Sequence, residues 1–245
     1  MPKKIKASWN SSENEKILRK NFFKLFKNNP IPDDELLRNL YLFIKRQDLS
    51  DILFFNDLYK EIINIHGSIM EFGVRWGRNL GLLSALRGIY EPFNHTRQII
   101  GFDTFKGLSS PNKKDGNHRI AKKGSLSVSK KYEEYLEKIL KYHDDESPIS
   151  HIKKFEIIKG DATKTLDRFL KDNPQTMIAM AYFDMDIYKP TKDCLNAIKP
   201  YLTKGSIIGF DEPNSKDFPG ETIAIKKIFG NIGFKLYQSR FSAGS

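Results

Sequence analysis

The chain has 245 residues, of which 39% are apolar and 12% aromatic. This composition is typical of folded globular proteins and excludes disordered and fibrous classes. The length fits one α/β domain with a helical appendage and excludes two independent full-size domains. Cys194 is the single cysteine, so an intramolecular disulfide is excluded, and no leader or apolar run of about 20 residues is visible. We therefore expect a cytoplasmic protein without a membrane span.

The net charge is strongly positive, because 41 Lys and Arg residues oppose 30 Asp and Glu residues and leave +11. Such a field attracts anions. The basic residues are scattered from Lys3 to Arg240 apart from short clusters such as Lys122-Lys123. A phosphorylated small substrate, a nucleic acid and a merely lysine-rich surface would each produce this pattern, so the charge alone does not choose among them.

Apolar residues in the first quarter of the chain recur at helical spacing. They predict one helix from Glu13 to about Asn28 and a second from Asp33 through Ile44, whose acidic first turn suits the positive end of a helix dipole. A third helix is predicted from Asp51 to His66. We interpret residues 1–66 as an N-terminal helical extension.

After Gly67 the pattern changes to short apolar runs that end in Gly or acidic residues, each followed by a helix-like stretch. This alternation predicts an α/β fold for residues 67–245, with a doubly wound, mostly parallel, Rossmann-like sheet. The expected strands are 68–73, 98–103, 155–158, 178–184, 206–211 and, more weakly, 234–237. The expected helices are 79–89, 129–143, 164–171, 191–202 and 222–229. The polar stretch from Asp103 to Ser127 is long enough to be a functional loop or lid.

Ligands of open α/β sheets bind beyond the carboxyl ends of the strands, and the first strand here ends in a glycine turn, residues 71–79. Arg75 and Arg78 occupy the second and third glycine places of the dinucleotide fingerprint, so a dinucleotide fits poorly. S-adenosylmethionine has no phosphates and carries a positively charged amino-acid part. The nearby carboxylate of Glu71 favours this cofactor.

Two further strand ends carry an aspartate. Asp103 ends the second strand, where its carboxylate can accept both ribose hydroxyls, or else cap a turn. Asp161 follows the third strand and either accepts from the adenine amino group or caps the next helix, because Asp before a helix is a common cap. Together with the glycine turn, these positions predict a nucleoside pocket.

The ends of the fourth and fifth strands bring four carboxylates together: Asp184, Asp186, Asp211 and Glu212. Adjacent parallel strands lie about 4.8 Å apart, so Asp184 and Asp211 can reach one ion. Without a cation such a cluster would repel itself, and hard oxygen ligands favour Mg²⁺, with calcium or manganese as alternatives. Any single member could instead cap a helix or pair with a neighbouring lysine. A carboxylate left free of the metal could act as a general base toward a hydroxyl.

Five segments resemble the macrocin O-methyltransferases (TylF-type) and related deoxysugar O-methyltransferases of antibiotic biosynthesis. The similarity covers about residues 68–234, with the segments in order and at suitable spacing. The matching segments are EFGVRWG (71–77), GFDTFKGL (101–108), GDA (160–162), DMDIY (184–188) with Thr191, and residues 205–211. The second and fourth are fairly specific, whereas the glycine turn is not.

The resemblance implies a class I S-adenosylmethionine-dependent fold and Mg²⁺-dependent methyl transfer to a sugar hydroxyl. It implies that Asp184, Asp211 and Glu212 hold the metal and that Asp186 deprotonates the acceptor. It also implies a cofactor site formed by Glu71, Gly73, Gly77, Asp103, Ser127, Asp161, Ala162 and Asp184, with Ser127 as a lid contact. The family usually has two aspartates where this chain has Asp211-Glu212, and a glutamate can still bind Mg²⁺.

Two other functions compete with sugar methylation. The first is a non-catalytic, basic nucleic-acid-binding protein with a vestigial cofactor pocket, which the four carboxylates disfavour because they would repel phosphates. The second is methylation of an amine or a phenolic hydroxyl. We expect a sugar or glycoside substrate, nucleotide-linked, polysaccharide or natural-product, no nucleic-acid partner, and a homodimer formed through the apolar N-terminal helices.

Overall fold

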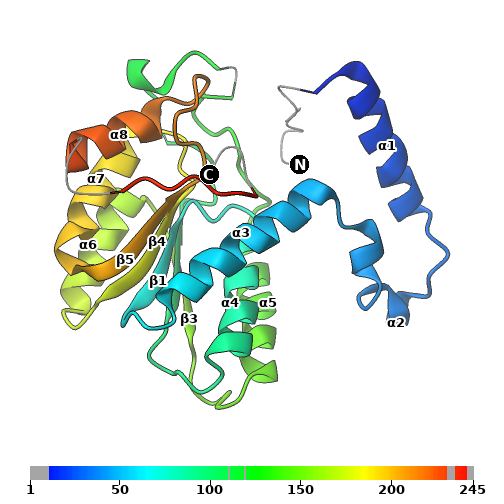
Figure 1. The fold of residues 1–245 in the computed structure, drawn as a ribbon, viewed down its shortest axis with the longest axis horizontal. Helices are drawn as coiled ribbons and strands as arrows, with labels where there is room; N and C mark the ends of the chain where they lie inside the picture. Colours follow the sequence, from blue (N-terminus) through cyan, green and yellow to red (C-terminus); the bar gives the residue numbers. More distant parts are fainter. Residues whose placement is uncertain (1–10, 110, 119, 231–234, 242–245) are drawn as a thin grey trace.

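A five-stranded, all-parallel sheet forms the centre of the protein in a computed structural model that describes residues 11–109, 111–118, 120–230 and 235–241 (Figure 1). The strand order is β3-β2-β1-β4-β5. The strands are β1 (Ser68–Phe72), β2 (Ile99–Asp103), β3 (Phe155–Lys159), β4 (Ile178–Phe183) and β5 (Leu202–Phe210). The predicted doubly wound fold is therefore confirmed. The order reverses between β1 and β4, which is the switch point where such sheets bind ligands.

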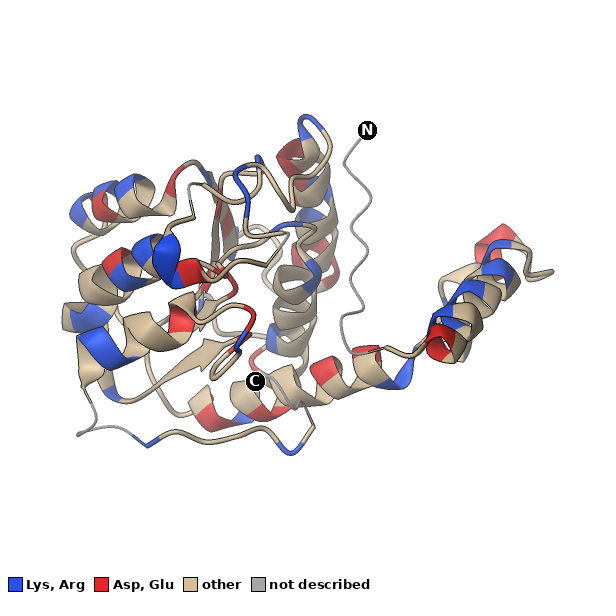
Figure 2. Ribbon diagram, turned by 90° about the horizontal axis from the view of Figure 1, so that it is seen from above, with Lys and Arg blue, Asp and Glu red and all other residues tan. Residues whose placement is uncertain are grey.

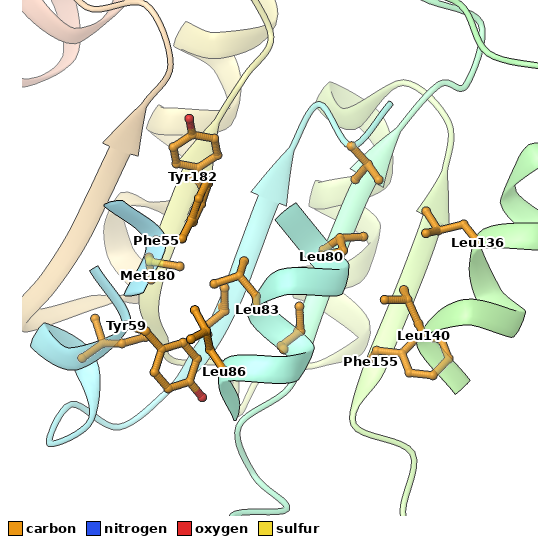
Figure 3. Packing of buried hydrophobic residues seen from close by; sticks show 14 of the residues in the cluster. Phe55, Tyr59, Leu80, Leu83, Leu86, Leu136, Leu140, Phe155, Met180 and Tyr182 are labelled. Carbon is orange, nitrogen blue, oxygen red and sulfur yellow. The ribbon is translucent and has the colours of Figure 1, made fainter. Parts of the chain in front are cut away.

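Helices cover both faces of the sheet. One face packs against α3 (Arg46–Ile62), α4 (Arg78–Tyr90) and α5 (Tyr132–Glu146) through the cluster shown in Figure 3. The other face packs against α6 (Ala162–Asp172), α7 (Tyr188–Ile198) and α8 (Gly220–Phe229). Because both faces are covered, the strands carry long apolar runs instead of alternating patterns, and all six residues of β4 are buried.

Four phenylalanines align the ends of the strands. Phe102, Phe72, Phe183 and Phe210 stack in that order across β2, β1, β4 and β5, with ring centroids 5.1, 4.6 and 5.5 Å apart. They are also register partners in the sheet. The residue that follows each phenylalanine is therefore placed at one common edge, and those residues are Asp103, Gly73, Asp184 and Asp211.

The N-terminal elements α1 (Glu13–Lys27), α2 (Asp33–Leu36) and the 3₁₀ helix η1 (Leu40–Phe43) stand away from the sheet as an arm (Figures 1 and 2). None of their residues is buried. The prediction of one helix from Asp33 through Ile44 is wrong. The side chain of Asn39 donates to the carbonyl of Glu35, which offers the chain a turn instead of a continued helix.

Other element boundaries also differ from the prediction. The third helix, α3, begins five residues earlier than expected, at Arg46 instead of Asp51. The expected strand at 234–237 is wrong for residues 235–237, which form no strand, while Phe234 lies outside the described residues. Leu236 and Tyr237 are exposed, so this segment gains little apolar burial from pairing with β5.

Two further features of the described residues concern the distribution of basic side chains and the character of the helices. In the view of Figure 2, Lys and Arg are spread over several helices and loops and do not form a single stripe. Among the described residues, no helix has the length and apolar character needed to cross a membrane.

Candidate active site

A cavity of about 470 Å³ opens at the carboxyl ends of the strands, at the switch point between β1 and β4. Most of the residues predicted from the sequence line it. They are Gly73, Asp103, Asp161, Ala162, Asp184, Asp186, Asp211 and Glu212. Glu71, Gly77 and Ser127 do not line it, so any role they have in cofactor binding is not by direct lining in this conformation.

The glycine turn after β1 is shaped by close packing. Gly73 has φ +96°, and a Cβ there would collide with the carbonyl oxygen of Asp184, so only glycine lets β1 and β4 end this close together. Gly77 is the N-cap of α4 and has φ +74°, and a Cβ there would collide with Leu136. The backbone N–H of Arg75 donates to Asp103 Oδ2 at 2.7 Å, which joins the ends of β1 and β2.

Glu71 is buried beneath this turn, with 1% of its surface exposed. Its Oε1 accepts a hydrogen bond of 2.9 Å from Asn79 Nδ2, and its Oε2 has no partner. Burial raises the pKa of Glu71 to about 8, although the bond from Asn79 acts in the opposite direction. An unpaired buried acceptor costs about 1–3 kcal/mol, so a cationic ligand group near Oε2 would relieve this cost.

Asp103 and Asp161 both line the cavity, and both also accept hydrogen bonds from backbone N–H groups. Asp103 Oδ1 accepts from the N–H of Phe105 at 2.5 Å, and each oxygen keeps a second lone pair for a ligand hydroxyl. Asp161 caps α6, accepting from the N–H of Thr163 at 3.1 Å and from its hydroxyl at 2.8 Å. Contacts of these two carboxylates with ribose and adenine stay predictions.

The four carboxylates predicted at the ends of β4 and β5 face the same cavity. Burial, followed by repulsion from Asp211 and Asp186, raises the pKa of Asp184 well above its usual range. Burial and repulsion from Asp211 and Glu212 raise the pKa of Asp186 to about 7, although Arg75 lowers it. Burial also raises the pKa values of Asp211 and Glu212. The cluster therefore holds negative charge at a cost that a bound cation would reduce.

The same cluster can be tested as a metal site. Within the described residues, no three acidic, histidine or cysteine side chains are placed to hold a metal ion together. The chemistry of the donors nevertheless suits a hard cation, because all four are carboxylates that raise one another's pKa. To hold a metal ion together, the four carboxylate side chains would have to rotate on the ends of their strands.

Several residues of the site were not predicted from the sequence. Tyr182 donates its hydroxyl to Asp211 Oδ1 at 3.1 Å, and Arg78 pairs with Asp51 of α3 at 3.0 Å. The spacing of Tyr182 and Asp184 is a signal that could have indicated Tyr182, since residues two apart on a strand share a face. Asn79 and Glu221 carry no such signal, because their contacts cross between elements.

The loop between β2 and α5 contributes Leu108, Ser109, Ile120 and Leu126 to the cavity wall, so it is part of the site, and its role as a lid stays a prediction. It is anchored by Asp115 in the 3₁₀ helix η2 (Lys113–Asp115), which is fully buried. Asp115 Oδ1 accepts from the N–H of Tyr188 at 2.5 Å, at the start of α7. The loop is thus attached directly to the segment that carries Asp184 and Asp186.

Comparison with solved structures places this chain in a known group of enzymes. The crystal structure of CalS11, calicheamicin methyltransferase, is 43% identical over 94% of this chain and 90% of that chain, with a TM-score of 0.88. The chain belongs to the methyltransferase family of CalS11. An apo structure of CalS11, described as a TDP-rhamnose 3'-O-methyltransferase of calicheamicin biosynthesis, is 41% identical over 94% and 91% of the two chains, with a TM-score of 0.80.

Of the other comparisons, one supports the fold alone and two found no match. The O-methyltransferase NovP is 19% identical over 73% of this chain and 70% of that chain, with a TM-score of 0.55. No protein-family model and no curated protein matches the chain. Membership of the CalS11 methyltransferase family makes the chain an O-methyltransferase with a class I fold, and methyltransferases of this kind use S-adenosylmethionine as the methyl donor.

Proposed function

We propose that the protein is a Mg²⁺-dependent O-methyltransferase that transfers the methyl group of S-adenosylmethionine to a hydroxyl of a sugar, either nucleotide-linked, in a polysaccharide or in a natural-product glycoside. The observation that carries the proposal is that Asp184, Asp186, Asp211 and Glu212 line one cavity together with the glycine turn. The sugar acceptor is supported by the relationship to CalS11. The motifs shared with macrocin O-methyltransferases support a place within that wider group.

The proposed roles follow the positions of the side chains. Asp184, Asp211 and Glu212 would hold Mg²⁺, and Glu71 would attract the ammonium group of the cofactor through its unpaired Oε2. Asp103 and Asp161 would hold the nucleoside part beside Ala162. When bound, the cofactor supplies an electrophilic methyl group and Mg²⁺ makes the acceptor hydroxyl more acidic.

Asp186 is the proposed general base. It lines the cavity at the end of β4, and its raised pKa of about 7 lies near physiological pH, where a base is most effective. It would accept the hydroxyl proton as the sugar oxygen forms its bond to the methyl carbon and the carbon–sulfur bond breaks. The rest of the site would align oxygen, carbon and sulfur, which lowers the barrier by making the transfer effectively unimolecular.

We also propose a homodimer. The arm exposes large apolar side chains, and joining two copies would remove them from water. They include Ile17, Leu18, Phe23, Leu25, Leu37, Tyr41 and Leu42.

The function can be tested by calorimetric titration with S-adenosylmethionine, then with Mg²⁺, followed by a screen of sugar acceptors for the mass of one added methyl group. We expect cofactor binding, a second heat on adding Mg²⁺, and a methylated sugar whose formation stops with EDTA and resumes with Mg²⁺. Absence of cofactor binding would contradict the enzyme assignment. Full activity in EDTA would contradict the metal, and methylation of amines alone would contradict the sugar acceptor.

A further inference from the structure

We propose that Glu221, at the start of α8, is a positioning residue that holds the base Asp186 and the proposed ligand Glu212 in their working geometry. This inference rests on the proposed function, because that function makes Asp186 the base and Glu212 a metal ligand. Glu221 is fully buried and does not line the cavity, so it has no direct access to substrate.

Glu221 joins the two loops that carry the proposed catalytic carboxylates. Its Oε1 accepts hydrogen bonds from the backbone N–H groups of Met185 at 3.1 Å and Asp186 at 3.3 Å. Its Oε2 accepts from the backbone N–H of Glu212 at 3.4 Å. One carboxylate therefore connects the segment after β4 with the segment after β5, and a shift of either segment would be transmitted to the other.

The backbone at Asp186 needs such support. Its φ is +61°, a left-handed conformation that non-glycine residues adopt at a cost and keep only where the surroundings impose it. Each backbone N–H from residue 184 to 188 has an acceptor. In chain order the acceptors are Phe72 O, Glu221 Oε1, Glu221 Oε1, Met185 O and Asp115 Oδ1. Glu221 supplies the two acceptors at the strained point itself.

Burying a carboxylate at position 221 costs free energy. Burial and the neighbouring carboxylates of Asp186 and Asp211 raise its pKa, so an uncharged side chain would be easier to bury. Only a carboxylate offers two acceptor oxygens, one for each loop. A glutamine would keep its carbonyl oxygen for Met185 and Asp186, but its NH₂ group would meet the N–H of Glu212, donor against donor.

Three variants separate positioning from simple structural support. Glu221→Met removes both acceptors at similar size, and Glu221→Gln keeps one. Thr222→Val is the matched control. The hydroxyl of Thr222, the next residue of α8, accepts from the backbone N–H of Asn214 at 2.7 Å, whereas the N–H groups of Met185, Asp186 and Glu212 donate to Glu221. The two measurements are amide hydrogen exchange by NMR and steady-state methylation of the acceptor found in the screen.

We expect amide exchange to quicken by roughly tenfold or more at Met185, Asp186 and Glu212 in Glu221→Met, at Glu212 alone in Glu221→Gln, and at Asn214 alone in Thr222→Val. We expect kcat to fall about 100-fold in Glu221→Met, with part of it retained in Glu221→Gln and all of it in Thr222→Val. The KM of the sugar and the affinity for S-adenosylmethionine should stay within about twofold in all three.

Unchanged exchange at Met185 and Asp186 in Glu221→Met would overturn the inference, and so would wild-type kcat in that variant. If Glu221→Met fails to fold, the restricted exchange pattern and intermediate kcat of Glu221→Gln decide the question. The exchange arm does not require turnover. A wild-type protein that methylates no sugar would therefore count against the proposed function, while the exchange pattern would still decide whether Glu221 holds the two loops.

Discussion

Replacing Glu71 by glutamine should change how stability depends on pH. The unfolded pKa of a glutamate is about 4.3, and burial raises the folded value for Glu71 to about 8. Because the folded pKa is the higher one, the stabilisation from this group is fully present below the unfolded value and is lost as the pH rises through about 8. Glutamine carries no proton to lose, so Glu71→Gln should lack this part of the pH dependence.

The size of the effect follows from the two pKa values. Between about pH 5.5 and 8.5 the unfolded chain has already lost this proton, whereas the folded chain keeps it until the pH approaches its folded pKa. Integrated over this range, the difference in bound protons equals about 2.3 pH units, and each unit is worth about 1.4 kcal/mol. The cofactor-free wild type should therefore lose about 3 kcal/mol more than Glu71→Gln across this range. Urea unfolding of both proteins at the two pH values measures the difference.

The same variant separates the stability of the site from its function. At about pH 8.5, where most of Glu71 is ionised, Glu71→Gln should bind S-adenosylmethionine at least about tenfold more weakly, since the attraction of the buried carboxylate for the ammonium group is lost, and calorimetry measures this affinity. Equal pH dependence of the two proteins, within about 1 kcal/mol, would show that Glu71 does not titrate as a buried group and would refute the reasoning.

Four further changes test other parts of the molecule. Asp186→Asn should lower kcat by about 10²–10⁴ with little change in cofactor affinity, and a wild-type rate of methylation would remove Asp186 from the role of base. Gly73→Ala should cost about 3 kcal/mol in urea unfolding because its Cβ meets the Asp184 carbonyl; wild-type stability would show that the strand ends are not so close. Asp161→Ala should lose about 1 kcal/mol with the cap of α6, and unchanged affinity for S-adenosylmethionine in calorimetry would limit Asp161 to capping. Deleting residues 1–45 should leave Tm within about 2 °C, while a mass by light scattering equal to that of the full-length assembly would contradict dimerisation through the arm.

The methyltransferase class and the fold were accessible from local patterns. A buried parallel strand is mostly apolar, and it ends near a cluster of polar or glycine residues, so β1 and β4 could be located from the runs SIMEF and IAMAYF alone. For that reason Asp103, Asp184 and Asp211 were predicted at one edge of the sheet, where the structure places them.

Local patterns failed where burial did not follow from periodicity. The apolar stripe from Leu36 to Ile44 has helical spacing but no core to cover, and it breaks at Asn39 into α2 and η1. The segment 234–237 has the composition of a strand, yet its residues Leu236 and Tyr237 remain exposed. In both places the sequence shows apolar side chains, but it does not show whether a core lies next to them.

By itself the sequence determined which elements form and which side chains stand at the ends of the strands, because those properties depend on neighbours a few residues away. Only the tertiary structure decided that Glu221 reaches Asp186 across 35 residues, that Tyr182 bonds to Asp211 across 29, and that Glu71 lies beneath the turn with an unpaired oxygen. Such contacts depend on how two separate elements pack, and hydrophobic spacing along one element carries no information about its partner.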